Sequence, residues 1–180
     1  MSRIPLIQPD TATPAAAELL NGVQKAMGVT PNMTKAMVNS PAVLKGYLAF
    51  AGALAGSELR PQVRERIALL AAQENGCDYC LSAHTYTAAK VAKLDQSEVE
   101  QARQAKSADP HAEAALSLAA AVLRSRGGLT DGDVDAARTA GLSDAEVAEV
   151  IATVSLSIFT NYFNKAVSTD LDWPEVRHDQ

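Results

Sequence analysis

Prolines and glycines divide this 180-residue chain into segments of helical length. Four prolines suit the first turn of a helix, where a missing N–H is tolerated: Pro14, Pro41, Pro61 and Pro110. Four glycines follow where helices should end: Gly28, Gly56, Gly76 and Gly127. Between them apolar residues recur at helical spacing, as at Val63, Ile67 and Leu70, and no segment has a convincing strand pattern. The sequence therefore predicts an all-α protein.

The same signals predict the extent of each helix. We expect helices over residues 15–27, 31–38, 41–55, 61–75, 77–93, 95–104, 110–124, 130–140 and 143–167. Ser143 followed by Glu146 is typical of a capping box and supports the last of these starts. The prediction is a single-domain bundle of about seven to nine helices over residues 1–180. Residues 1–12 are expected to form an extended arm, 41–91 the core region that carries the motif, and 168–180 an irregular tail.

Composition limits the partners of the protein. Hydrophobic residues make up 47% of the chain, charged residues 21% and aromatic residues only 4%, which suits closely packed helices. The net charge of −5 argues against nucleic acid or an anionic membrane as a partner, since both attract basic surfaces. No apolar run approaches the roughly 20 residues that span a bilayer, and no signal peptide is recognisable. We therefore expect a cytoplasmic protein, in which paired cysteines are catalytic or metal-binding rather than structural.

The two cysteines of the chain, Cys77 and Cys80, form a CxxC pair with His84 four residues further on. In a helix that begins near Cys77, positions 77, 80 and 84 share one face. The partial positive charge at a helix N-terminus favours a thiolate, which is the reactive form of cysteine. His84 is within reach to accept or return a proton, and Glu65 on the preceding helix is placed to orient His84. The four residues together predict a thiol-redox active site.

This arrangement predicts the reduction of a peroxide without a metal or an organic cofactor. One thiolate attacks a peroxide oxygen and becomes a sulfenic acid, and the second thiol condenses with it to a disulfide and water. An external dithiol then restores both thiols by exchange. Two other interpretations remain open. The cysteines could bind zinc, although structural zinc usually takes four ligands and His111 and His178 lack ligand spacing, or they could be small buried hydrophobic residues.

A weak internal repeat relates two parts of the chain. With a shift of 84 residues, the start of the helix before the cysteines aligns with residues 149–152. In this register Cys77 falls on Asn161 and Cys80 falls on Asn164. This register is typical of an ancestral pair of helices that was duplicated, with the cysteines kept only in the first copy. If the two copies fold back on each other, Asn161 and Asn164 line the pocket opposite the sulfurs.

The spacing Glu65-x11-Cys77-x-Tyr79-Cys80-x3-His84 resembles the signature of the alkylhydroperoxidase D-like group of the carboxymuconolactone decarboxylase superfamily. The end of the chain resembles the peroxidase-related branch of that group. The resemblance implies an all-α bundle that assembles as a homo-oligomer, a trimer or a hexamer, with its site near subunit contacts. It also implies a thiol-dependent peroxidase or disulfide reductase, an antioxidant oxidoreductase.

The resemblance assigns roles to the motif. Cys80 would be the peroxide-reactive thiol and Cys77 its resolving partner. Glu65 would relay protons, and His84 would tune or shuttle them. Tyr79 stands where some members carry a second histidine, and because tyrosine is a poor base near pH 7, we expect it to hydrogen-bond or shape the pocket. The implied partners are a hydroperoxide substrate and an external dithiol, thioredoxin-like or lipoyl reductant.

Two functions outside this class are weighed against it. A decarboxylase acting on a small lactone acid rests on superfamily analogy alone, and that branch does not depend on a CxxC pair. A non-catalytic redox sensor or binding module would be oxidised stoichiometrically, without turnover. Of the remaining candidates, Arg60, Arg64 and Arg66 are expected to form a solvated helix face. We expect His178 to be uninvolved and Trp173 to be a packing anchor.

Overall fold

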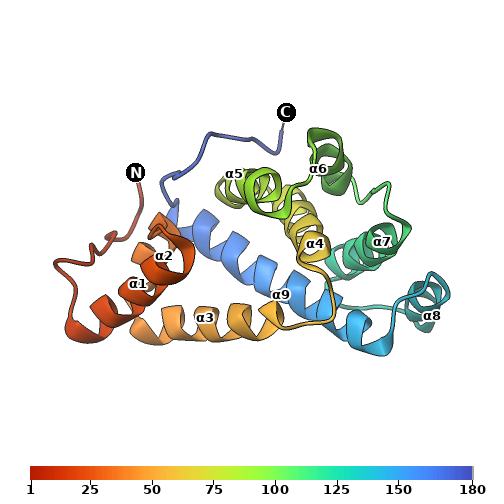
Figure 1. The fold of residues 1–180 in the computed structure, drawn as a ribbon, viewed down its shortest axis with the longest axis horizontal. Helices are drawn as coiled ribbons and strands as arrows, with labels where there is room; N and C mark the ends of the chain where they lie inside the picture. Colours follow the sequence, from red (N-terminus) through yellow and green to blue (C-terminus); the bar gives the residue numbers. More distant parts are fainter. Residues whose placement is uncertain (180) are drawn as a thin grey trace.

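Helix α9 crosses the centre of the molecule, and the other helices pack around it and around α4 (Figure 1). The computed structural model describes residues 1–179. The elements are α1 (Pro14–Met27), α2 (Asn32–Met37), α3 (Pro41–Ala55), α4 (Pro61–Glu74), α5 (Asp78–Thr87), the π-helical turn η1 (Ala88–Ala92), α6 (Gln96–Arg103), α7 (Pro110–Ser125), α8 (Asp131–Thr139) and α9 (Asp144–Val167). Residues 1–179 contain no strand, and the predicted all-α, single-domain fold is confirmed. None of these helices has the combination of length and apolar content needed to cross a membrane.

Local signals explain where the helices begin and end. A proline occupies the first turn of α1, α3, α4 and α7, where it is tolerated. Thr130 and Ser143 close capping boxes at α8 and α9, and the second of these was expected from the sequence. The helix predicted over residues 77–93 is α5 followed by η1, which ends at Lys93 with a left-handed φ of 58°.

The apolar core consists of two clusters. The larger cluster surrounds α4, where Ile67 and Leu70 are almost completely buried between α7 and α9. The smaller cluster joins α1, α2 and α3 through Leu20, Met37 and Leu44. Each fully buried side chain of this size contributes about 1.5–3 kcal/mol, so α4 is held firmly. The candidate catalytic glutamate is therefore carried by a helix that is well anchored in the core.

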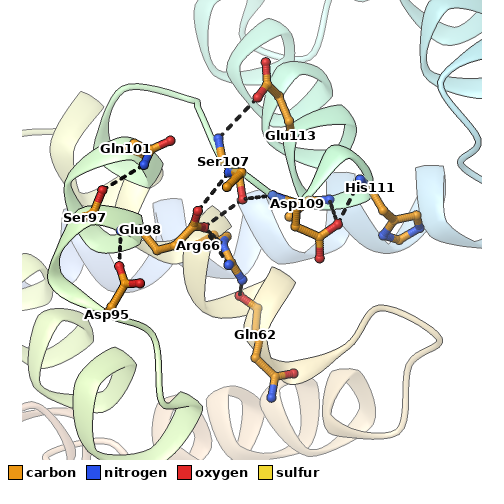
Figure 2. A network of polar contacts seen from close by, with 12 residues as sticks. Gln62, Arg66, Asp95, Ser97, Glu98, Gln101, Ser107, Asp109, His111 and Glu113 are labelled. Carbon is orange, nitrogen blue, oxygen red and sulfur yellow. Dashed lines mark hydrogen bonds and ion pairs between the residues drawn. The ribbon is translucent and has the colours of Figure 1, made fainter.

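Arg66 is buried, and the prediction that it lies on a solvated arginine face is wrong. Its Nε and Nη2 donate to one carboxylate oxygen of Glu98 at 2.9 and 2.6 Å, and its Nη1 donates to the Gln62 carbonyl at 3.2 Å (Figure 2). The Ser107 hydroxyl donates to the same Glu98 oxygen, and the Ala108 N–H donates to the other oxygen, both at 2.8 Å. This network ties α4 to α6 and to the segment before α7.

The other two arginines of that group differ from each other. Arg60 lies at the surface and pairs with Asp109 at 2.6 Å. Arg64 is half-buried and donates to the Ser57 hydroxyl at 2.9 Å and to the Leu59 carbonyl. Of the predicted solvated face, therefore, only Arg60 is exposed.

The two ends of the chain are tied to each other. One carboxylate oxygen of Asp170 accepts hydrogen bonds from the N–H and the hydroxyl of Ser2, both at 3.1 Å, and the other oxygen pairs with the Met1 ammonium at 3.0 Å. The Arg3 N–H donates to the carbonyl at the end of α9 at 2.7 Å. Residues 1–13 and 168–179 form no helix, and Gln180, the last residue of the predicted tail, lies outside the described residues.

Candidate active site

A glycine turn between α4 and α5 positions the two cysteines. Gly76 has a φ of 60°, in the left-handed region that glycine tolerates. Its N–H donates to the Gln73 carbonyl at 3.1 Å, and the Cys77 N–H donates to the Ala72 carbonyl at 2.9 Å, which is the pattern of a Schellman motif. Because this motif ends α4 within two residues, α5 begins at once with Cys77 as its N-cap.

The two sulfurs lie together in the first turn of α5. Both cysteines are free thiols, and they are nearly inaccessible, with 1% of Cys77 and 3% of Cys80 exposed. The Cys80 N–H donates to the Cys77 sulfur at 3.4 Å, so the thiol of Cys77 caps the helix. Unpaired amides and the helix dipole at this end both favour negative charge on sulfur.

His84 and Glu65 form a hydrogen-bonded pair beside the sulfurs. The His84 Nδ1 lies 2.8 Å from the Glu65 Oε1, so α4 and α5 are joined by their candidate proton-transfer groups. Burial opposes protonation of His84, but the charge and hydrogen bond of Glu65 outweigh it, and the pKa of His84 is raised. Because Glu65 holds Nδ1, Nε2 is the ring nitrogen left for proton transfer.

Cys80 is the more acidic of the two thiols. A hydrogen bond with the Cys77 side chain lowers the pKa of Cys80, and burial opposes this effect. The charge of His84 and the amides of Asn161 and Asn164 act in the same direction as the hydrogen bond. That hydrogen bond and burial together raise the pKa of Cys77. The pair therefore keeps its proton on Cys77 and carries its negative charge on Cys80.

Two asparagines of α9 lie on the other side of the sulfurs. The Asn164 Nδ2 donates to the Cys80 sulfur at 3.3 Å and to the Met33 sulfur at 3.2 Å. Asn161, one turn earlier, accepts a hydrogen bond from Asn75 at 2.9 Å and so holds the end of α4. Both asparagines are buried, and the Asn164 Oδ1 has no hydrogen-bond partner among residues 1–179. Asn164 thus stands beside the cysteine with which the internal repeat aligns it.

Tyr79 links α5 to two other segments. Its hydroxyl donates to the Asp172 carboxylate at 2.6 Å and accepts a hydrogen bond from the Met33 N–H at 3.1 Å. The ring forms a T-shaped contact with Trp173, with a centroid distance of 5.7 Å and an angle of 72° between the ring planes. Burial and then the bond to Asp172 raise the pKa of Tyr79. At neutral pH its hydroxyl is therefore protonated, which suits it to hold the tail and shape the pocket rather than to act as a base.

Cys80 and His84 face a small cavity of about 110 Å³. Its walls are mostly apolar and aromatic side chains, among them Met27, Met33, Tyr47, Tyr79 and Trp173. A second cavity of about 270 Å³ shares Tyr47 and His84 with the first and is lined by Glu65 and Arg64. His84 therefore lies where the two cavities meet, and Glu65 lines the second of them.

Tyr47 of α3 is a site residue that the sequence reasoning missed, because it was assigned to the apolar face of its helix. It lines both cavities. Burial raises the pKa of Tyr47, and the negative charges of Cys80 and Glu65 raise it further. The only signal in the sequence was a hydroxyl on an otherwise apolar helix, and nothing in its spacing connects it with the cysteines.

His178 is close to the motif, contrary to the expectation that it is uninvolved. Its Nδ1 lies 2.7 Å from the Asp78 carboxylate, and its N–H donates to the same oxygen at 3.0 Å. Its ring covers Gly76, where a Cβ would meet Nε2 at 3.1 Å. The tail thus braces the turn that carries Cys77. His111 instead pairs with Glu146 at 2.8 Å.

A metal site is not assembled around the cysteines. In the part of the chain that the structure describes, no group of three or more histidine, cysteine, aspartate or glutamate side chains is arranged to hold a metal ion. The two thiols and the His84 imidazole provide at most three donors, and a structural zinc ion usually takes four. This donor set does not fit the four-ligand zinc site that was weighed as an alternative.

Comparison with known proteins by sequence gives one family match. Residues 41–124 match the sequence model of the Carboxymuconolactone decarboxylase family. No curated protein matches the chain by sequence.

Several solved structures share the fold. A peroxidase-related protein from Ralstonia eutropha JMP134, described as an alkylhydroperoxidase AhpD core, matches with a TM-score of 0.85 and 20% identity over 95% of this chain and 92% of its own. A peroxidase-related protein from Silicibacter sp. TM1040 matches with a TM-score of 0.80 and 22% identity over 94% and 91%. A variant of the debrominase Bmp8 in complex with 2,3,4-tribromopyrrole matches with a TM-score of 0.78 and 21% identity over 96% and 94%.

Proposed function

Because residues 41–124 match the carboxymuconolactone decarboxylase family and the chain has the alkylhydroperoxidase D-like fold, we propose that it reduces hydroperoxides with the Cys77–Cys80 thiol pair. Cys80 is the thiol that attacks the peroxide, and Cys77 is the thiol that resolves the product. Glu65 and His84 handle the protons. The enzyme is an oxidoreductase that cycles between a dithiol and a disulfide.

One observation carries the proposal: the Cys80 sulfur accepts a hydrogen bond from Asn164 at 3.3 Å and shares a small cavity with His84. The lowered pKa of Cys80 makes it a thiolate near neutral pH, and only the thiolate is a strong nucleophile. The raised pKa of Cys77 suits it to keep a proton until the second step. The pair is thus divided into a nucleophile and a resolving thiol.

In the first step the Cys80 thiolate attacks the terminal oxygen of the hydroperoxide. The O–O bond breaks, its electron pair leaves with the alkoxide, and Cys80 becomes a sulfenic acid. The His84 imidazolium donates its Nε2 proton to the alkoxide, which departs as the alcohol. Glu65 holds Nδ1 at 2.8 Å, and its charge favours the protonated ring that this step needs.

In the second step the Cys77 sulfur attacks the sulfur of the Cys80 sulfenic acid. A disulfide forms, and the hydroxide leaves as water with the proton that Cys77 releases. The two sulfurs need little movement for this, because both lie in the first turn of α5 and the Cys80 N–H already contacts the Cys77 sulfur. An external dithiol then returns the pair to its reduced form.

The cavity favours a small organic hydroperoxide. Its volume of about 110 Å³ and its walls of methionine and aromatic side chains suit a short alkyl or aryl group better than hydrogen peroxide. The adjoining cavity of about 270 Å³ gives a larger substrate room beyond His84.

A second candidate reaction uses the same residues. One protein of this fold is a debrominase that binds a brominated pyrrole, and the aromatic walls formed by Tyr47, Tyr79 and Trp173 suit a small flat ring. Reductive debromination would replace the C–Br bond by C–H and release bromide while the two thiols form a disulfide. A small halogenated pyrrole therefore belongs in the substrate panel for this chain.

The exposed face of α3 supports assembly into a homo-oligomer, with a trimer or a hexamer expected. Among the fifteen residues of α3 only Lys45 is charged, yet only Leu44 is buried, and Phe50 is 39% exposed. Phe159 and Tyr162 of α9 are exposed as well. Light scattering of the purified protein measures the state directly. We place the enzyme in the cytoplasm, where dithiol reductants are maintained.

Mass spectrometry of the intact protein tests the proposal. The reduced protein is treated with cumene hydroperoxide, and we expect each chain to lose two hydrogens and to regain them with dithiothreitol. Cys77→Ser and Cys80→Ser should each abolish this change, whereas Ser155→Ala on the exposed side of α9 serves as a control that should behave like the parent chain. Full peroxidase activity in both cysteine variants would refute the proposal.

The assay of turnover separates the alternatives. A peroxidase forms many equivalents of alcohol per chain when a dithiol is supplied, whereas a redox sensor stops after one. Conversion of a small lactone acid by the variant that lacks both cysteines would instead favour the decarboxylase.

A further inference from the structure

We infer that the chain has a separate binding site for a small dithiol reductant on the Cys77 side of the thiol pair, formed with Lys165, Ser168 and Thr169. This inference rests on the proposed dithiol–disulfide cycle. It adds the location of the second half-reaction and the direction from which the disulfide is attacked.

The two sulfurs line different cavities. Cys80 lines the cavity that also contains His84, whereas Cys77 lines a cavity of about 240 Å³ at the junction of α5 with the end of α9. Tyr79 and Asn164 border both cavities and form the wall between them. A disulfide between the cysteines therefore presents one sulfur to each side.

The second cavity has the chemistry that a thiolate needs. Lys165, in the last turn of α9, donates from its ammonium group to the Asn75 carbonyl at 2.5 Å and lines the cavity with its remaining donors available. Its charge favours a negative sulfur at Cys77. Thr169, 8% exposed, also lines the cavity, and its buried hydroxyl has no partner among residues 1–179. An incoming thiolate would thus meet a positive charge and a spare hydroxyl.

The carboxylate that borders this cavity already has hydrogen-bond partners. Asp78 lines it, but its side chain is paired with the ring and the N–H of His178 at 2.7 and 3.0 Å. These hydrogen bonds partly offset the negative charge of Asp78, and Lys165 contributes a positive charge to the cavity.

The difference in acidity between the cysteines decides which sulfur is attacked. In thiol–disulfide exchange the thiol with the lower pKa leaves faster. Attack on Cys77 expels Cys80, whose thiolate is stabilised by Asn164 and His84, whereas attack on Cys80 would expel the less acidic Cys77. Acidity therefore points to Cys77, the sulfur that lines the second cavity.

The exchange takes place in two balanced steps. One thiolate of the dithiol bonds to the Cys77 sulfur, the S–S bond breaks, and its electron pair leaves on Cys80. The second thiolate of the dithiol then attacks the reductant sulfur of this mixed disulfide and expels Cys77, which takes up a proton. The reductant leaves as a cyclic disulfide, two electrons having passed to the cysteine pair.

The first experiment locates the mixed disulfide. The purified full chain is oxidised to its disulfide with diamide, which does not depend on peroxidase activity. It is then mixed briefly with 2-mercaptoethanol, acid-quenched and analysed by tandem mass spectrometry. We expect the adduct on Cys77, with Cys80 free. An adduct mainly on Cys80 overturns the inference.

The second experiment tests the charge of the site. Rapid mixing of the oxidised chain with dithiothreitol should give a rate constant about tenfold lower for Lys165→Glu, with a smaller loss for Lys165→Gln, which keeps a donor for the Asn75 carbonyl. Lys25→Glu is the matched control, because Lys25 also lies in the last turn of a helix but lines neither cavity. The disulfide of Lys25→Glu should be reduced at the parental rate.

Measuring the rates of peroxide oxidation and of disulfide reduction separately distinguishes the possible outcomes. Oxidation of the reduced Lys165→Glu chain by cumene hydroperoxide should stay within about twofold of the parental rate, since Lys165 does not line the Cys80 cavity. Equal slowing of both half-reactions, or no slowing of reduction, contradicts the separate site. If peroxide oxidises no variant but diamide-oxidised protein is still reduced through Cys77, the reductant site stands and the peroxidase proposal fails.

Discussion

The side-chain amide of Asn164 donates a hydrogen bond to the Cys80 sulfur at 3.3 Å across 84 residues of sequence. The bond places a neutral donor, rather than a second cation, against the candidate nucleophile. Asn164, Cys80 and His84 all line the same cavity. The acidity of Cys80 therefore depends on α9 as well as on its own helix.

Removal of this donor should make Cys80 less acidic. In Asn164→Ala on a Cys77→Ser background, we expect the pH midpoint of Cys80 alkylation to rise by about one unit, because a hydrogen bond to a charged group contributes about 1.5–3 kcal/mol. Iodoacetamide alkylation followed by mass spectrometry measures the midpoint. Asn39→Ala, at a surface position, is the control and should leave it unchanged. An unchanged midpoint in Asn164→Ala would contradict this role.

The pH profile of peroxide oxidation should be bell-shaped. The lowered pKa of Cys80 makes the rate rise with pH from below the range of an ordinary thiol, as the thiolate forms. The raised pKa of His84 makes the rate fall again at higher pH, once the imidazolium that protonates the leaving group is lost. His84→Gln should be slower and should lack the falling limb. Single-turnover rates from pH 4 to 10 test this, and an unchanged falling limb in His84→Gln would exclude His84 as the acid.

Substitution of Gly76 should destabilise the turn before the cysteines. Gly76→Ala places a Cβ at a φ of 60°, which costs about 1–2 kcal/mol, and brings it within 3.1 Å of the His178 ring. We expect a lower free energy of unfolding in urea and slower disulfide formation. In Gly76→Ala/His178→Ala the steric part of the loss should be recovered and the backbone part should remain. Equal stability of Gly76→Ala and the parent chain would be inconsistent with the turn described.

The Arg66–Glu98 pair should make stability depend on pH. Burial raises the pKa of Glu98, but bonds from Ala108, Ser107 and Arg66 outweigh this and lower it below the usual value. A lowered folded-state pKa contributes stability above the unfolded pKa of about 4.3, and that contribution is lost as the pH falls through the folded value.

Glu98→Gln tests this dependence by urea unfolding between pH 3 and 7. At pH 7 we expect a loss of about 3 kcal/mol, since Arg66 is left buried without its partner, and a weaker dependence on acid. Replacement of both partners in Arg66→Met/Glu98→Leu should restore part of the stability. Arg138→Ala, which breaks two exposed pairs, should change little. Identical acid dependence in Glu98→Gln and the parent chain would rule out this source of stability.

The helices and the thiol motif were predictable because their determinants are local. Proline at a first turn, a capping box and a left-handed glycine act within a few residues, so the observed helices begin and end close to the predicted positions. The spacing of Cys77, Cys80 and His84 along one helix is local in the same sense. These signals persist whatever the helix packs against.

The surroundings of the motif were decided by packing. Asn164 beside Cys80, His178 on Asp78 and Tyr79 on Asp172 join residues 84 to 100 positions apart. The internal repeat anticipated the first of these contacts, but no spacing in the chain predicted the other two.

What the sequence by itself determined is the set of helices and the presence of a thiol pair with an acid and an imidazole in register. Only the tertiary structure decided that Arg66 is buried, that Tyr47 enters the site and that each sulfur faces its own cavity. The physical reason is the distance along the chain over which each effect acts. Helix starts and stops depend on a few neighbouring residues, whereas burial, proton affinity and access depend on which distant helices come to lie against a side chain.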